Sequence, residues 1–204
     1  MTKKWQVFPE INIETQKLFP QIDPIILQLL ANRNIKTQEA MDSFFNFDYQ
    51  KQIHDPFIFL DMKKVVSRIF KAISQKEKIA IYGDYDADGI CSSVILYKTL
   101  LELGNKPIVY IPHRDLEGYG LNEKAIKILA KKKINLIITV DCGISTYLEI
   151  KLANKLGLDV IITDHHHVPE KIPPALAVIN PKVPQENYPF RDLAGVGVAF
   201  KLVQ

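Results

Sequence analysis

From residue 78 onward, short apolar runs rich in β-branched residues recur along the chain, and segments with helical periodicity separate them. Strands are expected near residues 78–82, 107–111, 135–140, 159–163 and 176–179. Helices are expected between them, near residues 90–103, 122–132 and 145–156. Such alternation is typical of a parallel sheet with helices on both faces. The pattern therefore predicts an α/β fold.

The residues before this pattern, 1–55, are expected to form a small helical N-terminal element. Short helices are expected over 25–31, where Asp23 precedes Pro24, and over 38–45, where Thr37 can cap the first turn. Residues 56–204 then make up the α/β domain.

A further helix is expected to open the α/β domain, with Asp61 as its cap. Its apolar residues recur at helical spacing and predict one buried face, made of Val65, Val66, Ile69, Phe70 and Ile73. Later in the domain, Gly104 and Gly157 are expected to end the helices that precede them.

Length and composition limit the classes of protein to which the chain can belong. The 204 residues suit one main domain with a small appendage, and 47% apolar residues suffice for a substantial core. A net charge of +3 is too small to indicate nucleic-acid binding by itself. Only two cysteines are present, and no apolar run reaches the ~18 residues of a membrane span. We expect a cytoplasmic protein that does not enter a membrane.

Candidate chemistry begins directly after the first strand, in the segment Tyr-Gly-Asp-Tyr-Asp-Ala-Asp-Gly at residues 82–89. In an extended chain, Asp84, Asp86 and Asp88 point the same way, and three clustered carboxylates repel one another unless a cation lies between them. A calcium loop of the EF-hand type also begins in this way. However, its twelfth position requires Glu and is Ile95 here, and a strand precedes the motif where an EF-hand has a helix. The remaining alternative is a solvated turn that caps the next helix.

Two more strands end in groups that can bind a metal. Asp141-Cys142-Gly143 follows the third strand, and Asp164-His165-His166-His167 follows the fourth. Each segment alone could be a helix cap or a solvated turn. In a parallel sheet, however, the carboxyl ends of the strands meet at one edge, where ligands bind. Their joint placement therefore predicts a metal site.

The ordered motifs resemble those of the DHH phosphoesterase superfamily: residues 83–89, then 141–143, then 164–166. More narrowly, the chain resembles the RecJ-type single-strand-specific 5′→3′ exonucleases. This narrower match rests on segments at residues 30–34, 55–57, 111–114, 117–120, 179–182 and 194–197.

The resemblance implies roles for individual residues. Asp86 and Asp88 would bind two different divalent ions, with Asp84 joining or supporting the first. Asp141 would bridge the two ions, and His165 would bind one of them.

For the neighbouring residues, the resemblance implies that His166 meets the scissile phosphate and that Asp164 orients the histidines as an acceptor outside the metal shell. His167 is an extra histidine that we expect to face solvent. Mixed carboxylate and imidazole ligands suit two Mn²⁺ ions, with Mg²⁺ possible.

The sequence indicates the substrate contacts less clearly than the metal ligands. Arg114 follows the second strand and can contact a phosphate, although a surface salt bridge explains it equally well. Gly195 and Gly197 open a helix whose free amides could face a phosphate, although close helix packing explains these glycines nearly as well.

The implied function is hydrolysis of single-stranded DNA in repair and recombination, with no protein partner identified. One alternative is another phosphoesterase of the superfamily that acts on short oligonucleotides, cyclic dinucleotides or pyrophosphate. A second alternative is a non-catalytic nucleic-acid-binding relative. The resemblance also implies a fourth metal-binding motif and a second domain beyond Gln204, so we expect the 204 residues alone to be nearly inactive.

Overall fold

The computed structural model describes residues 4–204 and divides them into two compact units, which are separated between Ile53 and His54. The first unit consists of short helices: α1 (Ile13–Leu18), α2 (Pro24–Asn32), α3 (Gln38–Phe45) and α4 (Tyr49–Gln52). Asp23 and Thr37 cap α2 and α3, as predicted. The helices α1 and α4 were not predicted. A small apolar cluster holds this unit together: Phe19, Leu27, Leu30 and Met41.

The second unit is built around a five-stranded sheet in the order β2-β1-β3-β4-β5, and all neighbouring strands are parallel. The strands are β1 (Ile79–Gly83), β2 (Ile108–Tyr110), β3 (Leu136–Val140), β4 (Asp159–Thr163) and β5 (Ala177–Ile179). Each agrees with its predicted position to within two residues. Every residue of the central strands β1 and β3 is buried.

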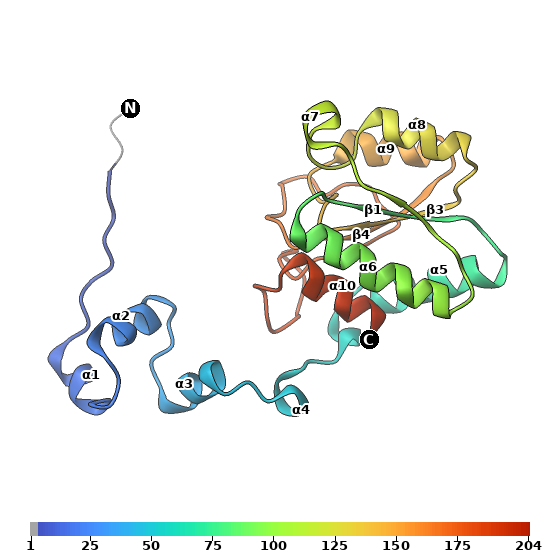
Figure 1. The fold of residues 1–204 in the computed structure, drawn as a ribbon. Coiled ribbons are helices and arrows are strands. Elements are labelled where there is room, and N and C mark those ends of the chain that lie inside the picture. Colours follow the sequence, from blue (N-terminus) through green and yellow to red (C-terminus); the bar gives the residue numbers. More distant parts are fainter. Residues whose placement is uncertain (1–3) are drawn as a thin grey trace. The chain divides into compact units, whose positions relative to one another are not determined.

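Helices cover both faces of this sheet (Figure 1). One face packs on α5 (Met62–Ser74), α6 (Ala87–Glu102) and α10 (Gly195–Val203). The other face packs on α8 (Glu123–Lys131) and α9 (Tyr147–Lys155). Two shorter elements, η1 (Pro56–Ile58) and α7 (Arg114–Glu117), complete the unit. The predicted fold class is confirmed.

Three local predictions were wrong, wholly or in part. Helix α6 begins at Ala87, so Asp88 lies in its first turn and not in an extended chain. Asp61 occupies the N-cap position of α5, as predicted, but its side chain makes no capping hydrogen bond, since its Oδ2 accepts a 2.9 Å hydrogen bond from the amide of Val178 in β5. Phe70 is 54% exposed, because the buried face of α5 is centred on Val65 and Ile69.

Candidate metal centre

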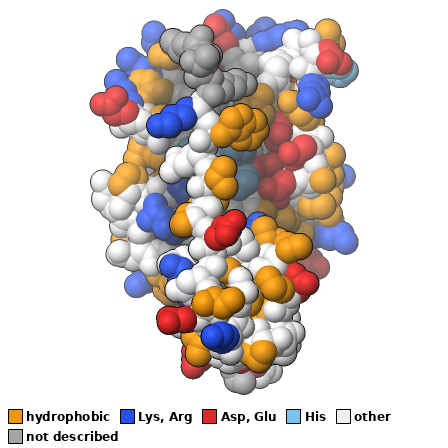
Figure 2. All heavy atoms as spheres, turned by 90° about the vertical axis from the view of Figure 1, so that its left-hand side faces the viewer, with side chains coloured by type: hydrophobic (Ala, Val, Ile, Leu, Met, Phe, Trp, Pro, Cys, Tyr) orange, Lys and Arg blue, Asp and Glu red, His pale blue; other side chains and the backbone are white. Residues whose placement is uncertain are grey.

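The carboxyl ends of β1, β3 and β4 bring the predicted acidic and imidazole groups together. One group of possible ligand atoms comes from Asp84, Asp86 and Asp141, and another from Asp141, His165 and His166. Within each group, the atoms lie within 4.8 Å of one another. Asp141 belongs to both groups and is therefore the residue that two neighbouring sites would share. Figure 2 shows acidic side chains gathered beside histidine on this part of the surface.

Close packing of strand and helix positions the first acidic segment. Asp86 is the N-cap of α6, and its Oδ1 accepts a 3.0 Å hydrogen bond from the amide of Gly89. A Cβ at Gly89 would lie 2.5 Å from the carbonyl oxygen of Asp84, so only glycine allows the helix to start so near the strand. The carboxylates of Asp84 and Asp86 are thereby held at the start of α6.

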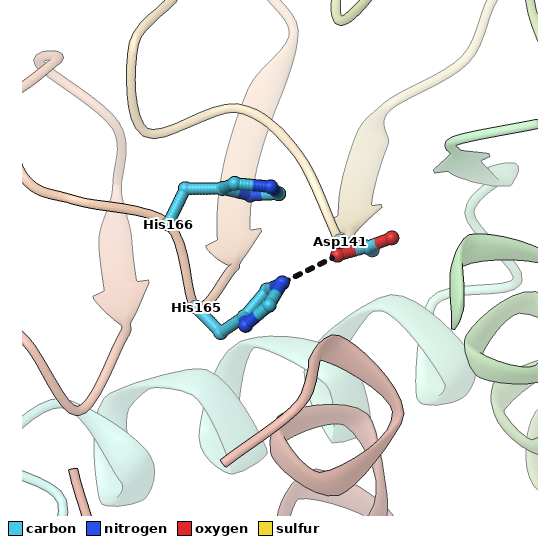
Figure 3. Close-up of side chains that lie close together, drawn as sticks. All are labelled: Asp141, His165 and His166. Atoms are coloured by element: carbon cyan, nitrogen blue, oxygen red, sulfur yellow. Dashed lines mark ion pairs between the residues drawn. The ribbon is translucent and has the colours of Figure 1, made fainter. Parts of the chain in front are cut away.

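Asp141 lies at the centre of the site and has an unusual backbone. Its φ is +60°, in the left-handed region, which costs a non-glycine residue about 1–2 kcal/mol. Its side chain is only 2% exposed, and Nε2 of His165 lies 3.1 Å from Oδ1 (Figure 3). Within residues 4–204, Oδ1 has no hydrogen bond of good geometry, and the same is true of the buried Oδ1 of Asp84.

The electrostatics follow from burial and crowding. Burial, together with the charges of Asp88 and Asp86, raises the pKa of Asp141 to about 8. The pKa of Asp84 is also raised, mainly by burial and to a smaller extent by the charge of Asp86. A negative charge on these carboxylates is therefore costly without a cation, and two buried oxygens lack hydrogen bonds in the part of the chain that the structure describes. The carboxylate and imidazole donors fit a divalent metal ion.

Asp164 is buried and accepts hydrogen bonds through both oxygens. Its Oδ1 accepts from Nδ1 of His166 at 2.7 Å and from the amides of His165 and His166 at 2.7 and 3.1 Å. Its Oδ2 accepts from the amide of Ile144 at 2.9 Å. Burial raises the pKa of Asp164, but these hydrogen bonds outweigh burial, so that the pKa is lowered overall. Asp164 thus fixes the orientation of the loop and of the His166 ring.

The two histidines differ in their surroundings. The hydrogen bond to Asp164 raises the pKa of His166, whereas burial and the neighbouring His166 lower the pKa of His165. The rings point differently in Figure 3: His165 is directed at Asp141, and His166 lies to one side. His167 belongs to neither group of possible ligands among the described residues, and its side chain is exposed.

Asp88 lies beside the groups but has another partner. Its Oδ2 and Oδ1 accept hydrogen bonds of 2.6 Å from the amides of Gly195 and Val196, at the start of α10. Its Oδ2 is also 3.7 Å from Nε2 of His165. The amide of Gly195, predicted as a phosphate donor, is therefore engaged by Asp88. A Cβ at Gly195 would lie 2.4 Å from Oδ1 of Asp141, so this glycine allows α10 to approach the site.

The other predicted contacts lie around the edge of the centre. Arg114 is exposed, and its guanidinium carbon lies 5.3 Å from the centre of the Tyr85 ring. No ion pair of Arg114 occurs among residues 4–204. Gly197 lies against Leu193, whose Cδ2 would be 3.1 Å from an added Cβ. The hydroxyl of Tyr119 also contacts the site. No role was predicted for this residue, although two flanking glycines mark its position.

Comparisons with known proteins place the chain in a family. A model described as "DHH family, N-terminal domain" matches residues 78–204. Among curated relatives, the single-stranded-DNA-specific exonuclease RecJ of Bacillus subtilis is 44% identical over 201 residues, which is 98% of this chain and 25% of that protein. RecJ of Haemophilus influenzae is 34% identical over 88% of this chain and 31% of that protein. The chain thus spans about a quarter to a third of the length of these relatives.

Solved structures agree with the sequence matches. An exonuclease RecJ bound to manganese is 34% identical, with a TM-score of 0.63 over 71% of this chain and 37% of that one. RecJ of Thermus thermophilus in complex with Mn²⁺ is 25% identical, with a TM-score of 0.66 over 93% of this chain and 26% of that one. The resemblance predicted from the motifs is confirmed, and the chain belongs to the DHH family.

Proposed function

We propose that the whole protein hydrolyses phosphodiester bonds of single-stranded DNA as a metal-dependent 5′→3′ exonuclease. The observation that carries this proposal is the buried carboxylate of Asp141, which lacks a hydrogen bond at Oδ1 within the described residues and belongs to two groups of possible metal ligands. Similarity to RecJ over 98% of the chain supports the substrate, and the direction of digestion rests on the RecJ-type motifs.

The residues proposed to hold two divalent ions, Mn²⁺ or Mg²⁺, are Asp84, Asp86, Asp88, Asp141 and His165. Asp88 can serve although it caps α10, because each carboxylate oxygen has two lone pairs and a backbone amide occupies only one of them. When bound, such ions lower the pKa of a water molecule and neutralise charge on phosphate oxygens.

The protein's own groups would orient the substrate. Asp164 holds Nδ1 of His166, which leaves Nε2 free to donate a hydrogen bond to a phosphate oxygen when the ring is protonated. Arg114 is exposed and carries a fixed charge, so it suits a neighbouring phosphate. Gly195 and Gly197 have packing roles in the structure, and a phosphate contact by the amide of Gly195 would require Asp88 to release it.

The match to RecJ also bears on the alternatives. It extends through the N-terminal helical unit and is not confined to the metal-binding motifs, which favours an exonuclease over a phosphoesterase of small substrates. The proposed domains remain 1–55 and 56–204, and the proposed location is the cytoplasm. No helix within residues 4–204 is long and apolar enough to cross a membrane.

The test compares three substrates with the whole protein and Mn²⁺: single-stranded DNA labelled at either end, blunt duplex DNA, and a cyclic dinucleotide. We expect single-stranded DNA to be digested from its 5′ end and the duplex to be digested poorly. Faster hydrolysis of the cyclic dinucleotide, or equal hydrolysis of the duplex, would contradict the proposal.

A further inference from the structure

The loop between α7 and α8 carries Tyr119 between two glycines whose backbones are left-handed. Gly118 has φ +77° and Gly120 has φ +78°, values that other residues rarely adopt. The carbonyl oxygen of Gly120 accepts a 2.9 Å hydrogen bond from the hydroxyl of Tyr82, a wholly buried residue of β1. The loop is therefore anchored to the sheet directly beside Tyr119.

From this anchored loop, the hydroxyl of Tyr119 reaches the ends of two other strands. It lies 3.3 Å from the carbonyl oxygen of Asp141, after β3. It also lies 3.2 Å from Nδ1 and 3.5 Å from Nε2 of His166, after β4. The two rings meet edge to face, with centres 5.7 Å apart. One hydroxyl thus contacts both the shared carboxylate residue and the histidine proposed to face the phosphate.

The placement of hydrogens follows from the partners. Nδ1 of His166 lies 2.7 Å from the carboxylate of Asp164, which only accepts, so Nδ1 carries a hydrogen directed at Asp164. The hydroxyl of Tyr119 therefore donates to the carbonyl of Asp141, and its lone pairs face the edge of the imidazole. With both hydrogens directed elsewhere, the contact between the hydroxyl oxygen and the edge of the His166 ring is one of packing.

The backbone of Asp141 needs such support because it is left-handed. Its amide donates a 3.0 Å hydrogen bond to the carbonyl of Thr163 in β4. Its carbonyl is the group that accepts from Tyr119. Both peptide groups of this residue are thus held, one by the neighbouring strand and the other by the tyrosine.

We propose that Tyr119 is a positioning residue: its hydroxyl holds the backbone of Asp141 and the ring of His166 in one arrangement and so aligns the metal-binding carboxylate with the phosphate-facing imidazole. The catalytic consequence rests on the proposed function, whereas the effect on the His166 ring can be measured without substrate or metal.

The test is Tyr119→Phe, which removes the hydroxyl and keeps the ring. Tyr110→Phe is the matched control, because the Tyr110 hydroxyl donates to Glu117 at 2.6 Å in the same region and has no hydrogen bond to Asp141 or His166 among the described residues. The first measurement is the ¹⁵N NMR spectrum of the histidine rings in the metal-free 204-residue chain. We expect the His166 ring signals to shift or broaden in Tyr119→Phe and to stay unchanged in Tyr110→Phe.

The second measurement is the steady-state kinetics of the whole protein on single-stranded DNA with Mn²⁺. We expect Tyr119→Phe to lower kcat by roughly 10–100-fold, as is typical when a partner of a metal ligand is removed, with KM within about twofold. Unchanged His166 signals, an unchanged kcat, or a raised KM at constant kcat would each overturn the inference. If the wild-type protein shows no hydrolysis while Tyr119→Phe still alters the His166 signals, the proposed function fails and the positioning contact stands.

Discussion

The acidic residues at the two ends of the sheet differ in their ion-pair partners. At the amino end, Arg68 lies between two carboxylates, with ion pairs of 2.7 Å to Glu77 and 2.6 Å to Asp159. At the carboxyl end, Asp141 is 2% exposed, and within residues 4–204 no lysine or arginine lies within ion-pair distance of it.

The difference separates stability from function. A carboxylate that is paired with arginine helps to hold the sheet together. A buried carboxylate without a cation destabilises the fold, and such groups are typical of sites that bind a ligand. We therefore infer that the ion pairs at the amino end serve stability, and we propose that the carboxylates at the carboxyl end bind metal.

The largest expected effect comes from Asp141→Asn. Hydrolysis by the whole protein should fall by at least about 10²–10³-fold, because charge stabilisation at the reacting phosphate is lost. The metal-free 204-residue chain should instead become more stable at neutral pH, by about 1–3 kcal/mol, because the buried Asp141 must take up a proton when the chain folds, a cost that Asn does not have. Rate assays and urea unfolding give the two values.

Asp159→Asn is the matched control at the other end of the sheet. It should leave hydrolysis unchanged and lower the stability slightly, because Asp159 is half exposed. If both variants change stability in the same direction, the contrast between the two ends is wrong.

A smaller loss of hydrolysis is expected for Asp164→Asn. The amide has one acceptor oxygen, so it cannot accept all the hydrogen bonds that both oxygens of Asp164 now accept. The His166 ring should lose its fixed orientation, and kcat should fall roughly 10–100-fold. Kinetics with Mn²⁺ measure this, and a normal kcat in a folded variant would exclude the orienting role.

Arg68→Met should act on stability alone. It leaves Glu77 without its partner and should lower the free energy of unfolding by about 1–3 kcal/mol, since the pair is only partly buried. Mn²⁺ affinity should be unchanged, because Arg68 lies at the opposite end of the sheet. Thermal unfolding measures the change in stability, and titration calorimetry measures the Mn²⁺ affinity. A large loss of Mn²⁺ affinity would contradict the separation of the two ends.

The pH dependence of stability gives a further test of the buried carboxylate at the carboxyl end of the sheet. Burial raises the pKa of Asp141 from its ordinary value near 3.8 to about 8, so between these values the folded state binds more protons than the unfolded state. The contribution of Asp141 to stability therefore decreases as the pH rises from about 4 to 8. The stability difference between wild type and Asp141→Asn should grow over this range, and a constant difference would contradict the pKa shift.

Much of this site could be predicted from the sequence because strand ends are local features. Apolar runs mark the strands, and parallel strands bring the residues that follow them to one edge, so the meeting of Asp84, Asp141 and His165 required no tertiary detail.

Contacts between distant segments could not be predicted in this way. Asp88 was placed in an extended chain, but α6 starts before it, and its carboxylate caps α10 more than a hundred residues later. The side chain of Asp61 likewise bonds to β5 and makes no capping hydrogen bond in its own helix. Tyr119 reaches Asp141 and His166 only because the loop is anchored on Tyr82. Local spacing carries no information about such partners.

The central claim is that the carboxylates at the carboxyl end, which have no lysine or arginine partner among the described residues, hold divalent ions. Titration calorimetry of Mn²⁺ into the 204-residue chain, into Asp141→Asn and into Asp159→Asn tests it most directly. We predict that wild type and Asp159→Asn bind Mn²⁺ with the same affinity and that Asp141→Asn binds at least about tenfold more weakly. Equal binding by Asp141→Asn and wild type would contradict the account.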